Sequence, residues 1–260
     1  MTIILTSSSP LNFENSYSVE AGYADEKRHF DHHGAYSELQ CPANNEKIPA
    51  INPELCVISH MDADTLVGLW RLWGNEDIPS KNLQSGLDFE LIERIDLNGS
   101  SADPSGQSKE LSFMVGVGVL ARTLQMPRPS EEGVDVTELV LLMINTPVKK
   151  VIEMGLKAQK EAEKAYKDCL IERDGKKALF SIGANDPLDP SRPYQDGIEV
   201  VVVYRQHYQS ISVYCDPSSE HAFAGSILGG IEFAGHPKAC GSPRGVSYTV
   251  KDAERVFEVI

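Results

Sequence analysis

The residues best suited to chemistry in this chain of 260 residues alternate within one short segment. His60, Asp62 and Asp64 directly follow an apolar, strand-like run over 56–59. Alternating side chains on an extended turn share one side of it, and a mixed imidazole and carboxylate set suits Mn²⁺, Mg²⁺, Fe²⁺ or Zn²⁺. The alternative is a helix N-terminus whose acids complement the macrodipole, which explains the two acids but not the histidine. The segment therefore favours a divalent-metal site.

A second group of titratable residues is the triplet Asp31-His32-His33. Adjacent histidines project in different directions, so one can ligate a metal while the other reaches a substrate, and Asp31 can orient a ring. Taken alone, the triplet fits a polar surface turn equally well, because short motifs often match by chance.

Asp96 is a third candidate because of its place along a predicted helix. The apolar spacing predicts a short helix over 87–97 that ends at Asn98-Gly99. A carboxylate at the C-terminal end of a helix opposes the dipole, which indicates another role for Asp96. Considered in isolation, a plain Asn-Gly helix stop is the simpler interpretation.

A glycine-rich segment over 229–245 is the fourth candidate site. It contains Gly235, His236, Lys238 and Arg244. Glycines let backbone N–H groups approach an anion closely, and the three donor side chains add to that environment. The alternative is a glycine loop without a ligand, but three donors clustered among glycines favour an anion site.

The elements that must position these residues follow an α/β pattern. Strand-like runs over 2–5 and 56–59 are predicted, and the turn from a strand into a helix is where α/β folds expose functional side chains. An apolar stripe predicts a helix of about 25 residues from Pro147, a length that commonly joins two lobes. The remaining predicted elements are helices over 110–126 and 134–144, a hairpin of strands 198–204 and 210–215, a short helix over 216–230 and a helix from 251.

The charge is unevenly distributed along the chain. Acidic residues number 38 against 24 basic ones, a net charge of −14. Residues 172–260 hold 9 basic and 12 acidic groups, a net −3, which leaves −11 for residues 1–171. This excess argues against a long nucleic acid held by the protein alone.

Hydrophobic runs and cysteines indicate where in the cell the protein is expected to reside. No run approaches the roughly 20 apolar residues of a spanning helix, and the N-terminus lacks the features of a secretory signal. We therefore expect no membrane partner and a cytoplasmic location. Five scattered cysteines without a CxxC spacing are expected to be reduced structural fillers: Cys41, Cys56, Cys169, Cys215 and Cys240.

Three motifs together resemble the DHH phosphoesterase superfamily: Asp31-His32-His33, His60-Met61-Asp62-Ala63-Asp64 and Gly235-His236-Pro237. The resemblance implies a two-lobed α/β fold, with a larger metal-binding lobe around a mainly parallel sheet and a smaller α/β substrate-binding lobe. We accordingly expect a metal-binding domain over 1–145, a linker helix over 146–171 and a glycine-rich substrate-binding domain over 172–260. It also implies two divalent ions, Mn²⁺ in the first place and Mg²⁺ as the other choice.

The resemblance also implies metal ligands. His60, Asp62 and Asp64 would divide between the two ions, His32 would ligate the second, and Asp96 matches the isolated acid of the family's metal lobe. The triplet precedes the His60 segment here, whereas the family has the opposite order, so the motifs are permuted. The family's metal-bridging aspartate has two candidates upstream of the triplet, Glu20 and Asp25, and the sequence leaves both open.

The catalytic and substrate-binding residues implied by the resemblance lie in both lobes. His33 would face the substrate, with Asp31 as the second catalytic residue. His236 would bind substrate phosphate together with Gly235, Lys238 and Arg244.

The function expected from these residues is metal-dependent hydrolysis of a phosphoester or phosphoanhydride bond by activated water. The expected substrate is a small phosphorylated metabolite, a short oligonucleotide or polyphosphate, and the protein could act as a homodimer. The alternative is a non-catalytic protein of the same fold that senses a nucleotide or a metal.

Overall fold

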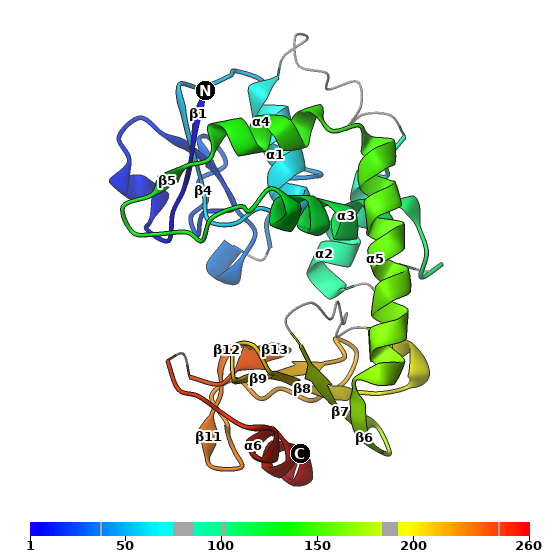
Figure 1. Ribbon diagram of the computed structural model, residues 1–260. Coiled ribbons are helices and arrows are strands. Elements are labelled where there is room, and N and C mark those ends of the chain that lie inside the picture. The colour runs from blue at the N-terminus through cyan, green and yellow to red at the C-terminus, as the bar shows by residue number, and fades with distance from the viewer. Residues whose placement is uncertain (37, 75–85, 100–101, 104, 184–191, 244) are drawn as a thin grey trace. The chain divides into compact units, whose positions relative to one another are not determined.

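The computed structural model describes the chain except residues 37, 75–85, 100–101, 104, 184–191 and 244. The chain divides into two compact units (Figure 1), a first unit of Met1–Leu97 with Ala102–Ala158 and a second that contains Gln159–Ile260. The division falls within helix α5, Val148–Asp168, in the segment predicted to be the linker helix. None of the helices in the described residues combines the length and apolarity needed to span a membrane.

The first unit is built on a five-stranded sheet of order β3-β2-β4-β1-β5. The first four strands run parallel, and only the edge strand β5 is antiparallel to its neighbour. The mainly parallel sheet expected for this lobe is therefore confirmed. The strands are β1 (Thr2–Leu5), β2 (Tyr17–Val19), β3 (His29–Phe30), β4 (Leu55–Ile58) and β5 (Val134–Asp135).

Helices of the first unit begin and end where the sequence provides caps. Asp62 accepts the N–H of Thr65 at the start of α1, and Gly74, in the left-handed region with φ 56°, ends that helix. Ser108 caps α3 in the same way. The helices are α1 (Ala63–Trp73), α2 (Phe89–Asn98), α3 (Lys109–Thr123) and α4 (Thr137–Asn145), with short 3-10 turns at Pro10–Asn12 and Gly34–Tyr36.

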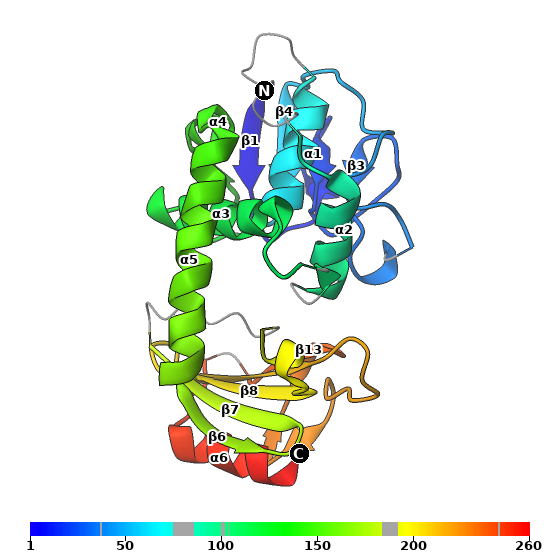
Figure 2. The ribbon, with the colours of Figure 1, turned by 90° about the vertical axis from the view of Figure 1, so that its right-hand side faces the viewer.

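The second unit contains a six-stranded sheet of order β12-β13-β9-β8-β7-β6, in which only the β7–β8 pair is parallel. Helix α6, Val250–Val259, starts with a capping box between Thr249 and Asp252 and packs on β7 and β8. The strands are β6 (Leu170–Asp174), β7 (Lys177–Ile182), β8 (Val200–Arg205), β9 (Ser210–Cys215), β12 (Ala234–His236) and β13 (Ala239–Gly241); Arg192–Asp196 forms a 3-10 turn. Figure 2 shows this sheet with α6 on one face.

The prediction of a short helix over 216–230 is wrong. The segment instead ends in a hairpin of β10, Ile227–Leu228, and β11, Ile231–Glu232. Gly229 and Gly230 form its turn with φ angles of 56° and 82°, and two consecutive left-handed residues are what a tight type I′ hairpin requires. The sequence pattern failed because a Gly-Gly pair is typical of both a helix stop and such a turn.

Helices α3 and α5 approach each other at two glycines. A Cβ atom on Gly116 would overlap the backbone carbonyl oxygen of Val151, and a Cβ atom on Gly155 would overlap that of Ser112. Gly118, two residues along α3 from Gly116, has only an ordinary contact with the side chain of Arg122. The close crossing of α3 and α5 therefore requires glycine at positions 116 and 155, but not at position 118.

We expect Gly116→Ala to lower the free energy of unfolding of the first unit by about 1–3 kcal/mol, because the added methyl must push two helices apart. Gly118→Ala is the matched control and should raise it by about 0.5–1 kcal/mol, since alanine is the better helix former. Urea denaturation followed by circular dichroism measures both. Equal effects at the two positions would contradict the close crossing.

Candidate metal centre

The carboxyl edge of the parallel sheet brings three distant segments together. Strands β3, β2 and β4 are neighbours, and their last residues are followed by Asp31, Glu20 and Ser59. Backbone pairing continues past the strand ends, because Glu20 N–H donates to Phe30 O at 2.9 Å and Ser59 N–H donates to Glu20 O at 3.1 Å. Functional side chains of α/β folds collect at this edge.

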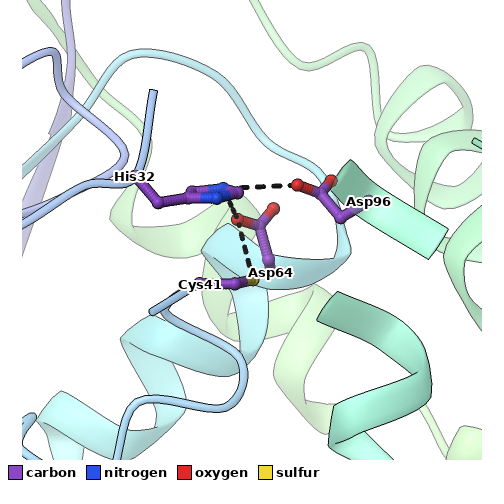
Figure 3. A group of neighbouring side chains, drawn as sticks. All are labelled: His32, Cys41, Asp64 and Asp96. Atoms are coloured by element: carbon purple, nitrogen blue, oxygen red, sulfur yellow. Dashed lines mark hydrogen bonds and ion pairs between the residues drawn. The ribbon is translucent and has the colours of Figure 1, made fainter. Parts of the chain in front are cut away.

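Four side chains converge beside this edge, at the N-terminal end of α1 (Figure 3). His32 Nε2 lies 3.4 Å from Asp64 Oδ2 and 3.2 Å from Asp96 Oδ2. Cys41 Sγ lies 3.6 Å from the same oxygen of Asp64. One potential donor atom from each of the four residues lies within 4.8 Å of all the others. His32, Asp64 and Asp96, predicted as ligands, are thus brought together.

Glu20 belongs to the same group of side chains. Its Oε2 lies 2.5 Å from His33 Nδ1, and its Oε1 lies 3.6 Å from His32 Nε2. The residue is only 1% exposed, and its φ of 53° places a non-glycine residue in the left-handed region. Glu20, His32, Cys41, Asp64 and Asp96 are called the buried cluster below.

Asp25, the other candidate for the bridging carboxylate, has a different task. Its Oδ1 accepts hydrogen bonds of 2.9 Å from the backbone N–H groups of Lys27, Arg28 and His29. These bonds fold the turn between β2 and β3 and lower the pKa of Asp25 despite the opposing effect of burial. Of the two acids that the sequence leaves open, Glu20 is the one that lies among the histidines.

Asp31 and His33 form a fixed pair. The carboxylate of Asp31 accepts the backbone N–H groups of Gly22 and His33, the latter at 2.7 Å, and lies 3.2 Å from His33 Nδ1. Hydrogen bonds to Asp31 and Glu20 raise the pKa of His33 to about 10. Because the side chain of His33 is 55% exposed, the pair presents a cationic ring to solvent.

His60 and Asp62 lie next to His33 and pair with each other. His60 Nε2 lies 2.9 Å from Asp62 Oδ2, and its Nδ1 lies 2.8 Å from Ser59 Oγ. The His60 ring centroid is 5.8 Å from that of His33 in an edge-on arrangement. Both side chains are 41% exposed, and among the described residues neither joins the groups whose donor atoms all lie within 4.8 Å. Their role as ligands stays a prediction.

The buried cluster has the polar atoms that a cation would satisfy. Apart from ion-pair contacts with one another, with Asp96 and with His33, both oxygens of Glu20, both ring nitrogens of His32 and Oδ1 of Asp64 are buried without a hydrogen-bond partner. Such burial is costly for polar groups. Within the described chain, the ion-pair contacts of Glu20, Asp64 and Asp96 are all to histidines and none is to Lys or Arg. A donor set of carboxylates and imidazole with orphaned atoms fits a divalent metal ion.

Burial and crowding set the protonation of the buried acids. Burial first, and then the charge of Asp62, raise the pKa of Asp64 well above its usual range. Burial also raises the pKa of Glu20, although its contact with His33 works in the opposite direction. For His32, burial lowers the pKa, but the carboxylates of Asp96 and Glu20 outweigh it and the net pKa is raised. In the metal-free cluster, bound protons therefore offset part of the negative charge that a metal ion would otherwise neutralise.

Cys41 is the member of the cluster that sequence reasoning missed. It was expected to be a structural filler, yet it lies fully buried beside Asp64. It comes from an irregular loop and has no neighbouring Cys or His at a ligand spacing, so no local signal marks it.

The glycine-rich segment lies in the second unit. Gly235 and His236 are on β12, and Gly235 is required there because its φ is 136° and a Cβ would lie 2.9 Å from Ala239 O. His236 is exposed, and its Nδ1 accepts the backbone N–H of Lys238 at 3.1 Å. The Lys238 ammonium donates to the carbonyl oxygens of Ser219 and His221, so it is engaged by backbone. Arg244 lies outside the described residues.

Comparison with known proteins gives similar structures but no similar sequences. No protein-family model matches the chain, and no curated protein sequence does. Similar solved structures include the pGpG-specific phosphodiesterase PggH of Vibrio cholerae, 15% identical with a TM-score of 0.40, covering 75% of this chain and 70% of that one. RecJ of Thermus thermophilus in complex with Mg²⁺ is 13% identical with a TM-score of 0.37, covering 75% of this chain and 30% of that one. An exopolyphosphatase-related protein of Bacteroides fragilis is 14% identical with a TM-score of 0.32, covering 94% of this chain and 81% of that one.

At such identities and TM-scores, structural likeness does not assign an activity. Any proposal about the activity has to be argued from the side chains of the site.

We expect the metal-free protein to lose stability as the pH rises from about 6.5 to about 10. The pKa of His33 is about 10 in the folded chain against an ordinary value of 6.5. Its contribution is therefore complete below pH 6.5 and is lost as the pH rises through the folded pKa. Thermal unfolding in the presence of a chelator, at steps across this range, measures the loss.

His33→Gln should flatten that part of the profile, because glutamine does not titrate. His207→Gln, at an exposed histidine of the second unit, is the control and should keep the wild-type slope. Identical slopes for wild type and His33→Gln would show that His33 does not hold its proton in this way.

Proposed function

We propose that this chain is a divalent-metal-dependent phosphohydrolase of the DHH phosphoesterase superfamily, which cleaves a phosphoester or phosphoanhydride bond with water. The observation that carries the proposal is the convergence of His32, Asp64 and Asp96 with Glu20, in a group whose carboxylates have histidines and no Lys or Arg as ion-pair partners among the described residues. A structural ion pair does not require several buried carboxylates to lie close together, whereas the ligands of a metal ion must do so.

Two ions account for the arrangement of donors. His32, Asp64 and Asp96 would hold one ion, and Glu20 would bridge to the second, because its two oxygens point to His32 and His33 on either side. The predicted ligands His60 and Asp62 would complete the second site, which requires them to exchange their mutual contact for the metal. Mn²⁺ suits such a mixed nitrogen and oxygen set, and Mg²⁺ is the other choice.

When bound, the two ions lower the pKa of a water molecule and stabilise the attacking and leaving oxygens of an in-line displacement. The protein contributes a cation at the open side of the cluster. His33 stays protonated at neutral pH, since its Nδ1 is held by Asp31 and Glu20. The exposed ring can therefore donate a hydrogen bond to phosphate oxygen or a proton to the leaving group. Asp31 positions His33, because its oxygens also accept backbone N–H groups.

The substrate class follows from charge and from the second unit. The acidic chain would repel a long polyanion, so a small phosphorylated metabolite, a short oligonucleotide or polyphosphate is favoured. In the second unit, His236 would contact substrate phosphate, since it is exposed and its Nδ1 is fixed by the Lys238 N–H. Gly235 would support it by allowing the close approach of β12 to β13.

Activity should be lost when either Asp64 or Asp96 loses its charge. We expect Asp64→Asn and Asp96→Asn to lower Mn²⁺-dependent hydrolysis of bis(p-nitrophenyl) phosphate, short oligonucleotides or polyphosphate by more than about 100-fold, since even an outer-shell partner is worth 10–100-fold. Asp25→Asn is the matched control, because asparagine can still cap the turn. If wild type binds nucleotide with a thermal shift but forms no product from any substrate, the protein is a binder and not a hydrolase.

Metal binding should also be visible in stability. Mn²⁺ should raise the unfolding temperature of wild type by mass action. Asp64→Asn should raise the unfolding temperature of the metal-free protein at neutral pH, because it removes the burial of an acid and the repulsion from Asp62, the two effects that raise the pKa of Asp64. It should also abolish the Mn²⁺-dependent increase. Differential scanning calorimetry with chelator or with Mn²⁺ measures both. An Asp64→Asn protein that keeps the full Mn²⁺ effect would rule out this acid as a ligand.

A further inference from the structure

The position of Cys41 is not that of an ordinary buried thiol. Its Sγ points at Asp64 Oδ2 from 3.6 Å, on the side of that carboxylate where His32 and Asp96 also lie (Figure 3). Cys56, the other fully buried thiol of the first unit, lies in strand β4, where its Sγ lies 3.9 Å from the backbone oxygen of Val57 and its hydrogen-bond partners are backbone groups of Val57 and Val19. Cys41 alone of these two faces carboxylates and imidazole.

A carboxylate on α2 fixes the loop that carries Cys41. Glu93 Oε1 accepts the backbone N–H of Cys41 at 2.9 Å, and Glu93 Oε2 accepts the Asn44 side-chain amide at 2.8 Å. Glu93 and Asp96 are three residues apart on α2 and so lie on the same face of that helix. One helix face thus supplies Asp96 to the cluster and holds Cys41 beside it.

Helix α1 fixes the same loop from another direction. Arg71 Nε donates to Ala43 O at 2.9 Å. A Cβ on Gly68 would lie 2.8 Å from Pro42 Cβ, so the glycine allows the loop to pack directly on the helix. Helices α1 and α2 therefore both hold the loop at Cys41 and the residues that follow it, and this packing directs the thiol at Asp64.

Three donor–donor distances in the cluster are close to those around a coordinated ion. With nitrogen and oxygen donors at about 2.0 Å and sulfur at about 2.3 Å from Zn²⁺, adjacent donors lie roughly 3.3 Å apart, or roughly 3.5 Å where one is sulfur. The corresponding pairs here are 3.4 Å and 3.2 Å from His32 Nε2 to the oxygens of Asp64 and Asp96, and 3.6 Å from Cys41 Sγ to Asp64. An S–H···O hydrogen bond alone would explain the last distance, but it leaves Nδ1 of His32 and Oδ1 of Asp64 without a hydrogen-bond partner.

We propose that Cys41 is a metal ligand, which adds a thiolate donor to the ion held by His32, Asp64 and Asp96. The inference rests on the metal site of the proposed function and adds a selectivity to it. Thiolate favours Zn²⁺ and Co²⁺ over Mg²⁺. The S–metal bond forms as the thiol proton leaves to solvent, so no oxidant or further reactant is needed.

Cobalt spectroscopy on the full chain tests this without any turnover. The protein is stripped with a chelator and titrated with Co²⁺, and the ultraviolet sulfur-to-cobalt charge-transfer band is recorded together with the visible d–d bands and the bound stoichiometry. Wild type should show the charge-transfer band, and Cys41→Ser should lose it. The same variant should bind Co²⁺ about 10-fold or more weakly, with less than about 3-fold change for Mg²⁺.

Cys56→Ser is the matched control, since it removes an equally buried thiol of the same unit, and it should keep the band. Bound Co²⁺ without a charge-transfer band in wild type, or a band that persists in Cys41→Ser, would overturn thiolate ligation while leaving the metal site intact. No Co²⁺ binding at all would overturn the metal site and the proposed function with it. If the serine variant does not fold, Cys41→Ala replaces it, and the wild-type spectrum still decides whether sulfur is bound.

Discussion

The first unit is organised around negative charge that is buried without Lys or Arg. Glu20 and Asp64 are each 1% exposed, and the described contacts that offset their charge come from histidines. Removing a carboxylate from water costs several kcal/mol unless the charge is compensated. The raised pKa of Asp64 and of His33 reduces part of that cost, because it favours a neutral carboxyl group and a positively charged ring. Under the proposed function, bound divalent ions would offset the remaining charge.

Backbone geometry holds the buried acids against this repulsion. Glu20 adopts a left-handed φ of 53°, which is unfavourable for a residue with a Cβ and persists only where the surroundings enforce it. Phe30 O accepts its N–H and the Ser59 N–H donates to its carbonyl, so three neighbouring strand ends fix this one residue. The sheet edge thereby turns the Glu20 carboxylate toward His33. Strain of this kind, at a junction of three strands, is typical of a functional position.

The sequence predicted the residues whose signal is local and missed those placed by distant contacts. His60, Asp62 and Asp64 are candidates because an apolar run passes directly into a helix there. The structure places Asp64 in the buried cluster, and the ligand role of His60 and Asp62 stays a prediction. The choice between Glu20 and Asp25 stayed open because β2 and β3 have only three and two residues, too few for a period-2 pattern. Cys41 gave no signal because its position depends on Glu93, Gly68 and Arg71, which lie far along the chain. The sequence did not predict the hairpin at Gly229, because a Gly-Gly pair is typical of helix ends as well as of tight turns.

Under the proposed function, the charge of the chain would make phosphate binding conditional on metal. Residues 1–171 carry a net −11, and a phosphate approaching this region without cations meets repulsion that only screening by salt reduces. Two divalent ions would offset four of those charges and do so at the place where substrate must arrive. A thiolate ligand at Cys41 would remove one positive unit from that balance, which makes the cationic ring of His33 the more important partner for phosphate. Metal choice, substrate charge and the protonation of His33 are therefore linked through a single electrostatic balance.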